Sequence, residues 1–153
     1  MGDKNIQLIN EDENIDDLQL NGLNLIQKKD GFKFGIDAVL LSDFANVKTR
    51  HRAIDLCTGT GIVPFLLYGK YSPQEVVGVE IQSDMVEMAE RSVKLNSLES
   101  KVSFINLDLK DIDGLKELGR FDVLTVNPPY KLNNSGIINP LDKLAIARHE
   151  IMC

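Results

Sequence analysis

The chain has 153 residues, of which 43% are hydrophobic and 26% are charged, and this composition is typical of a soluble protein with one globular domain. It excludes a disordered chain, and no apolar run is long enough to span a membrane. The amino terminus is acidic where a secretory signal peptide would be basic, so we expect a cytoplasmic protein.

The first segment, residues 1–17, carries most of the negative charge. It holds six acidic residues against Lys4 alone, whereas the net charge of the whole chain is −6. We expect this acidic leader to be flexible, because a polar, charged segment buries too little apolar surface to fold. The rest of the chain is nearly neutral, so its charge does not exclude a nucleic acid as a partner.

A small N-terminal unit is predicted for residues 18–50. Apolar residues alternate around Asn21-Gly22 and again around Asp30-Gly31, and both dipeptides favour tight turns, which predicts an antiparallel hairpin over residues 18–34. A helix is predicted next, over residues 36–44, with an apolar face formed by Ala38, Val39, Leu41 and Phe44.

From residue 51 to residue 153, strand patterns alternate with helical patterns. The predicted strands begin at Ala53, Val76, Val102 and Phe121, and the predicted helices cover residues 62–68 and 83–96. Such alternation is typical of an α/β domain in which helices cover both faces of a parallel sheet. We therefore predict a Rossmann-like, doubly wound parallel sheet as the core of the protein.

A glycine loop follows the first of these strands, in the sequence DLCTGTG. Gly59 and Gly61 lie where a strand leads into a helix, so the backbone can approach a ligand closely and the helix offers unpaired N–H groups. Pro64 occupies the position of the third glycine of a dinucleotide fingerprint, which disfavours a pyrophosphate. Asp55 would suit a positively charged group instead. Cys57 has no neighbouring Cys or His at metal-site spacing, and we expect no metal.

Two further acidic residues end the next two strands. Glu80 lies 19 residues after Gly61, at the spacing of an acid that accepts hydrogen bonds from both hydroxyls of a ribose. Asp108, with Leu109 behind it, is placed to contact the amine and the edge of an adenine. Taken singly, each acid is more readily explained as a plain surface residue. Together with the glycine loop they predict a ligand with a cationic end, a ribose and an adenine.

These residues carry a resemblance. Asp55, Gly59 and Gly61 match the first motif of the class I S-adenosylmethionine-dependent methyltransferases, Glu80 matches their ribose acid, and Asp108 matches their adenine-contacting acid. The chain resembles this class, and within it the methyltransferase small domain. The resemblance implies S-adenosylmethionine as the cofactor.

The fourth strand ends in Asn127, Pro128, Pro129 and Tyr130. An exocyclic amine is a poor nucleophile because its lone pair is delocalised. The carboxamide oxygen of Asn127 and the carbonyl of Pro128 can accept both of its N–H groups and orient the lone pair, while Tyr130 can stack on a flipped base. This motif resembles the signature of enzymes that methylate adenine N6, guanine N2 or the glutamine amide of release factors.

Two segments of the sequence favour one of these substrates. Residues 31–44 and the later pattern of Asn139-Pro140 with residues 147–150 are similar to the bacterial enzymes that methylate adenine N6 beside the anticodon of valine tRNA. The similarity implies tRNA as the partner. In that family the segment around Phe34 to Asp37 lies over the cofactor, which makes Lys33, Phe34 and Asp37 expected cofactor contacts. Release-factor enzymes carry a larger helical N-terminal domain, yet a glutamine-amide methyltransferase and an inactive cofactor-binding module both remain open.

The predicted sheet is short for this class. A class I sheet has seven strands, whereas the chain has four strand patterns before Cys153. The resemblance therefore implies a domain that is truncated after the fourth strand, in a fragment of a longer protein. The bare apolar edge of that strand would be a template for a homodimer.

Overall fold

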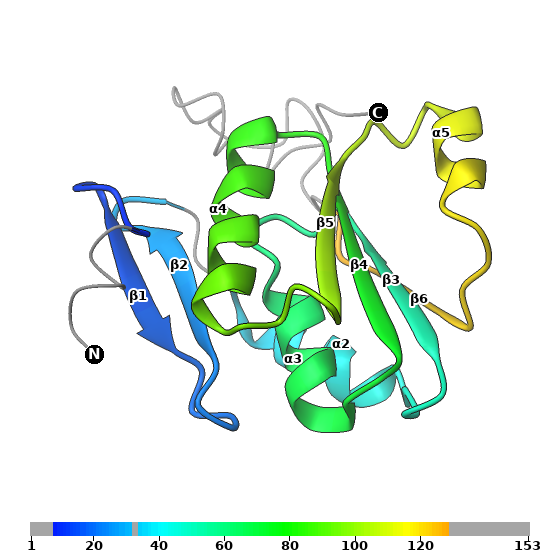
Figure 1. Cartoon of the computed structure of the whole chain (residues 1–153), viewed down its shortest axis with the longest axis horizontal. Helices are drawn as coiled ribbons and strands as arrows, with labels where there is room; N and C mark the ends of the chain where they lie inside the picture. Colours follow the sequence, from blue (N-terminus) through cyan, green and yellow to red (C-terminus); the bar gives the residue numbers. More distant parts are fainter. Residues whose placement is uncertain (1–7, 32–33, 129–153) are drawn as a thin grey trace.

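The computed structural model describes residues 8–31 and 34–128. Its centre is a parallel sheet of four strands in the order β5-β4-β3-β6 (Figure 1). The strands are β3 (Arg52–Leu56), β4 (Glu75–Glu80), β5 (Val102–Asn106) and β6 (Val123–Val126). All three ladders are parallel, and Asp55 on β3 is in register with Gly78 on β4 and Thr125 on β6. The predicted α/β class and the parallel sheet are confirmed.

Three of the helices confirm predicted ones, and one was not predicted. They are α2 (Ile36–Phe44), α3 (Ile62–Tyr71) and α4 (Ser83–Leu95), whereas the new helix is α5 (Ile112–Glu117). Phe44, expected on the inner face of α2, is 88% exposed, and Ser42 is buried instead. In the part of the chain that the structure describes, no helix has the length and apolar character needed to cross a membrane.

The main core lies between the sheet and helices α3 and α4. It includes fully buried side chains from both layers, such as Phe65, Leu67, Val76 and Ala89. Phe104 on β5 contacts Phe65 on α3, with ring centroids 6.0 Å apart. Burial of such aromatic and aliphatic side chains supplies the largest favourable contribution to folding.

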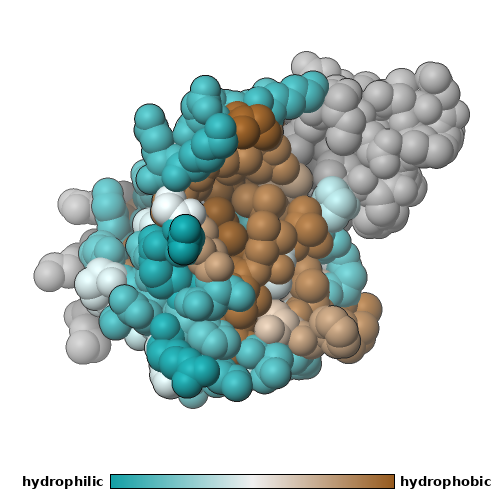
Figure 2. Space-filling model, turned by 90° about the vertical axis from the view of Figure 1, so that its right-hand side faces the viewer, coloured by the Kyte–Doolittle hydropathy of each residue, from teal (hydrophilic) through white to brown (hydrophobic). Residues whose placement is uncertain are grey.

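The opposite face of the sheet is apolar, and within the described residues only the short helix α5 lies on it. Because registered residues of parallel strands share a face, Leu124 and Val126 on β6 lie beside Ile54 and Leu56 on β3. Leu124 is 58% and Val126 41% exposed, and α5 buries none of its side chains. Figure 2 shows the resulting apolar area on the side where α5 and β6 lie in Figure 1. Among the described residues, α3 and α4 cover one face, and α5 lies on the other, where Leu118 and Phe121 beside it pack against the cluster of Ile54, Val77 and Val79.

The predicted N-terminal hairpin is present, but its first strand begins earlier than expected. The strands are β1 (Glu13–Asp17) and β2 (Asn24–Lys28), and the turn contains Asn21-Gly22. Residues 13–17 were expected to belong to a flexible acidic leader, and for them this prediction is wrong. The physical reason is that Glu13, only 2% exposed, finds a positive partner in the core domain.

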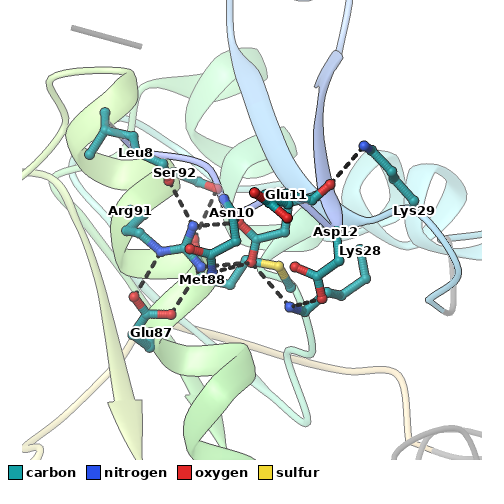
Figure 3. Close-up of polar contacts among 11 residues, drawn as sticks. Leu8, Asn10, Glu11, Asp12, Lys28, Lys29, Glu87, Met88, Arg91 and Ser92 are labelled. Carbon is teal, nitrogen blue, oxygen red and sulfur yellow. Dashed lines mark hydrogen bonds and ion pairs between the residues drawn. The ribbon is translucent and has the colours of Figure 1, made fainter. Parts of the chain in front are cut away.

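That partner is Arg91 on α4, which joins the hairpin to the core domain (Figure 3). Its guanidinium donates to both carboxylate oxygens of Glu13, at 2.6 and 2.8 Å, and also to Glu87. The hydrogen bonds from Arg91 lower the pKa of Glu13 to about 2. Ser92 of α4 accepts from the backbone N–H of Ile26, so α4 also satisfies part of the outer edge of β2. The hairpin is thus attached through polar contacts with α4.

Replacing Glu13 with glutamine is expected to lower the free energy of unfolding at pH 7 by about 2 kcal/mol, the size of a buried hydrogen bond to a charged group. Because the pKa of Glu13 is lowered from 4.5 to about 2, its contribution is complete above pH 4.5 and is lost as the pH falls towards 2. Urea unfolding of both proteins at pH 7 and pH 3 measures this. A constant difference between the two proteins at both values would contradict the assignment. Asp113→Asn, on exposed α5, is the control.

Candidate functional site

The predicted site residues gather at one edge of the sheet, where the parallel strands have their carboxyl ends. Residues 57–61 follow β3, Glu80 ends β4 and Asn127 follows β6, the strand next to β3. Ligands of open α/β sheets bind at this edge, outside the carboxyl ends of the strands. The candidate site is therefore formed by the same elements that the sequence pointed to.

The glycine loop has the backbone geometry that glycine allows best. Gly59 has φ 58° and Gly61 has φ 88°, both in the left-handed region. A Cβ on Gly61 would lie 2.4 Å from the Phe104 ring, so glycine is needed there for packing. A Cβ on Gly59 would meet no atom of the described residues within 4 Å. Gly59 therefore leaves an open approach to the backbone, as a bound ligand would require.

Glu80 holds the glycine loop in place. One oxygen of its carboxylate accepts the backbone N–H of Gly59 at 2.8 Å, and the other accepts the backbone N–H of Gln82 at 3.0 Å. The side chain is buried, with the residue only 4% exposed. The second oxygen also accepts Gln82 Nε2 at 3.3 Å, whereas the oxygen bound to Gly59 has one hydrogen bond and can accept another. Glu80 can thus shape the loop and still bind a hydroxyl.

Asp55 is a buried carboxylate in the middle of the site. It is 1% exposed, and its Oδ1 accepts the hydroxyl of Thr125 from β6 at 2.6 Å. Burial raises the pKa of Asp55 to about 6, and the hydroxyl bond only partly opposes this rise. Loss of hydration disfavours the charged form of Asp55, and a nearby positive charge would stabilise that form and lower the pKa again.

Replacing Asp55 with asparagine is expected to stabilise the protein at pH 8. The pKa of this carboxyl rises on folding from 3.8 to about 6, so its contribution to stability is complete below pH 3.8 and is lost as the pH rises through 6. The gain of the variant at pH 8 is at most about 3 kcal/mol, at 1.36 kcal/mol for each pKa unit. Urea unfolding at pH 8 and pH 4 measures it, and an equal gain at both values would contradict the burial of a charge.

Asn127 contacts a residue from the N-terminal unit. Its Nδ2 donates to Oδ2 of Asp37, in the first turn of α2, at 2.8 Å. Pro128 directly follows and is exposed. Tyr130, expected to stack on a base, and Lys33, expected near the cofactor, lie outside the described residues. The structure thus brings two predicted residues together, Asp37 and Asn127, although one was expected at the cofactor and the other at the substrate.

The other residues predicted to contact the cofactor make contacts within the protein. Strand β5 ends at Asn106, so Asp108 lies in the connection after it, where Oδ1 accepts the backbone N–H of Lys110 at 2.9 Å. Leu109 packs against the apolar cluster of Ile54, Val77 and Val79. Phe34 is half-buried against the main core.

Two residues of the site were not predicted. Thr125 binds Asp55 from the neighbouring strand, and Asn106 donates its amide to the backbone carbonyls of Glu80 and Ile81 at 3.0 and 2.8 Å. The signal for Thr125 was present, because it is the one hydroxyl in an apolar run from residue 121 to residue 126. Its partner depends on strand order, which the sequence did not give.

The arrangement fits the cofactor that the sequence implied. Gly59 leaves room for a ligand, and one oxygen of Glu80 can still accept a ribose hydroxyl. A cation beside Asp55 would stabilise the charged form of that carboxylate. Helix α3 begins at Ile62, and its N-cap residue Gly61 provides no side-chain cap, so N–H groups of the first turn are available as well. No feature of these residues conflicts with an adenosyl group carrying a positive sulfur.

Comparison with known proteins gives a family and a fold. The family model of the methyltransferase small domain matches residues 29–144. A tRNA1(Val) (adenine(37)-N6)-methyltransferase of Bacteroides thetaiotaomicron is 30% identical over 122 residues, which are 79% of this chain and 49% of that protein. The chain spans about half the length of the curated relatives of this kind, at 47% to 51%.

Two other matches extend the comparison. A ribosomal protein uL3 glutamine methyltransferase of Neisseria meningitidis is 34% identical over 80 residues, which are 52% of this chain and 25% of that protein. The crystal structure of Methanocaldococcus jannaschii Trm5 in complex with adenosine superposes with a TM-score of 0.59 at 18% identity, covering 92% of this chain and 40% of that one. At this identity the second match supports the fold alone.

Proposed function

This chain belongs to the methyltransferase small domain family, and from that membership we propose that it acts in an S-adenosylmethionine-dependent N-methyltransferase. The proposed substrate is an exocyclic amine, with adenine N6 in tRNA as the best candidate. The tRNA methyltransferases among its relatives, similar over most of this chain, support that choice.

One observation carries the proposal. Asn127 and Pro128 follow β6 at the sheet edge that also holds the glycine loop and Glu80, because β6 lies directly beside β3. An amine that donates hydrogen bonds to the Asn127 amide oxygen and the Pro128 carbonyl would therefore lie next to a ligand bound at the glycine loop. Holding two reactants in this way lowers the barrier by orientation, with no general base needed at the moment of attack.

The cofactor supplies an electrophilic methyl group on a positively charged sulfur. In the proposed complex Gly59 and Glu80 bind the ribose, and Asp55 lies on the side of the positive charge. Asp108 and Leu109 contact the adenine, while Phe34 covers it. Tyr130 stacks on the substrate base and thereby excludes water from the amine.

Methyl transfer to RNA tests the function. The purified protein is incubated with tritiated S-adenosylmethionine and total tRNA from a strain that lacks adenine-37 methylation. Label in tRNA, recovered as N6-methyladenosine after nuclease digestion, is the expected result. Calorimetry with the cofactor alone is run in parallel. Cofactor binding with no label in RNA or protein would instead support the inactive binding module.

A glutamine-amide methyltransferase is the second candidate. It is favoured by the similarity to the uL3 glutamine methyltransferase and by the same two acceptors, since a carboxamide nitrogen also carries two N–H groups. Label in a ribosomal protein or a release factor, with none in tRNA, would select it.

Self-association is a further proposal about partners. The exposed Leu124 and Val126 lie on β6, which has no strand on its outer side among the described residues. Apolar strands with an open edge favour pairing with another chain. Sedimentation velocity distinguishes a homodimer from a monomer.

A further inference from the structure

The contact between Asn127 and Asp37 joins residues that are 90 positions apart in the sequence. Asn127 Nδ2 donates to Asp37 Oδ2 at 2.8 Å, and Asp37 belongs to the first turn of α2. The contact therefore links the strand that carries the proposed substrate-binding motif to the helix that follows the N-terminal hairpin.

A carboxylate fixes which way a carboxamide points. The ionised side chain of Asp37 has only acceptors, so the amide of Asn127 must turn its NH2 group towards it. The amide oxygen, on the other branch of the same planar group, then faces away from Asp37. Without this acceptor the amide could rotate by 180°, and it would offer an N–H donor where the proposed substrate also brings N–H donors.

We propose that Asp37 is a positioning residue that holds the carboxamide of Asn127 with its oxygen towards the substrate amine. This inference rests on the proposed function and gives Asp37 a different part from the cofactor contact expected from the sequence. The carboxylate also polarises the amide to which it is bonded, which makes the oxygen a stronger acceptor. Asp37 acts through Asn127 and needs no contact with the reacting atoms.

Gly35 gives independent control over the position of this carboxylate. A Cβ on Gly35 would lie 2.5 Å from Asp37 Oδ1, which is the far end of a side chain that can move. The backbone at Gly35 has φ −98° and ψ −179°, which alanine adopts without strain. Gly35→Ala is therefore expected to displace the Asp37 carboxylate while it leaves the charge and the fold unchanged.

The kinetic test compares variants of Asp37 with a matched control. Asp37→Leu and Gly35→Ala are each expected to reduce kcat by about 10- to 100-fold, the loss typical of a misplaced catalytic group, with the Kd of S-adenosylmethionine unchanged. Asp37→Asn is expected to be rescued to within about 10-fold, because the new amide oxygen can still accept the N–H of Asn127. Asp43→Asn, on the same helix and paired with Lys70, is expected to behave like the unchanged protein.

A double variant separates positioning from an independent role. In an Asn127→Ala background, Asp37→Leu is expected to cause no further loss of rate, because the amide that it orients is gone. Additive losses would overturn the proposal. A rise in the Kd of the cofactor that matches the fall in rate would also overturn it, in favour of the direct cofactor contact.

Nuclear magnetic resonance keeps the inference apart from the proposed function. The side-chain NH2 signals of Asn127 in ¹⁵N-labelled protein are identified by their loss in Asn127→Ala. They are expected to shift in Asp37→Leu and Gly35→Ala and to stay unchanged in Asp43→Asn. If the unchanged protein transfers no methyl group, the proposed function fails, while these shifts still report the contact. If the NH2 signals of Asn127 do not shift in Asp37→Leu and Gly35→Ala, the contact between Asn127 and Asp37 does not form and the inference is wrong, whatever the activity.

Discussion

Replacement of Asn127 by alanine is expected to reduce methyl transfer by about 10²- to 10³-fold, the usual loss when one preorganised polar group is removed from an active site. The amide oxygen is one of the two acceptors proposed for the amine, and alanine cannot replace it. Asn127 follows β6 and none of its described contacts reaches the glycine loop, so the affinity for S-adenosylmethionine is expected to stay within about twofold. Single-turnover rates and calorimetry measure the two quantities.

Two further variants sharpen this result. Asn127→Asp places a second carboxylate against Asp37, and like charges in contact repel, so it is expected to be no more active than the alanine variant. Asn14→Ala removes an amide from β1, in the hairpin, and is the control for loss of an amide elsewhere. Undiminished transfer by Asn127→Ala would defeat the proposed mechanism, even if RNA proves to be the substrate.

Replacement of Gly61 by alanine is expected to lower the free energy of unfolding by about 3 kcal/mol, from left-handed strain of about 1 to 2 kcal/mol and overpacking of about 1 to 3 kcal/mol. The backbone there has φ 88°, and the added Cβ would lie 2.4 Å from the ring of Phe104. The buried side chain of Phe104, on β5, packs against Phe65 of α3, so it has little room to move. Urea unfolding measures the loss.

Gly59→Ala is the matched control within the same loop. Gly59 has φ 58°, but its added Cβ would meet no atom within 4 Å in the part of the chain that the structure describes. The expected loss of stability is therefore only the backbone strain, about 1 kcal/mol. The methyl group would stand in the proposed ligand approach, so the variant is expected to bind S-adenosylmethionine more weakly while it remains folded. Equal losses of stability in both variants would show that Phe104 yields to the added methyl group.

Local patterns were sufficient to predict most of the core domain. Continuous β-branched runs predicted the buried strands, and the spacing of Met85, Met88 and Val93 in α4 predicted a face that is buried in the structure. The glycines after β3 predicted the turn into α3, because few other residues adopt its backbone angles. These features depend on residues close together in the sequence.

Features that depend on distant partners were missed. Glu13 looked like one more solvated acid, and its burial requires Arg91, 78 residues away. Thr125 meets Asp55 only because β6 pairs with β3, and strand order is not written in local periodicity. Asp108 was placed at the end of a strand that stops two residues earlier, at Asn106, where the amide caps the neighbouring strand instead.

The two backbone hydrogen bonds that Glu80 accepts from Gly59 and Gln82 make the shape of the loop depend on the same side chain that is proposed to bind the ribose. An evolving variant could not trade this glutamate for a residue suited to another sugar or to a phosphate without first finding a new acceptor for the Gly59 amide. A substitution of Glu80 alone would leave the Gly59 N–H without this acceptor, so a compensating substitution has to come first. Directed evolution towards a different cofactor should accordingly begin with second-site changes in the loop, and only afterwards alter the acid.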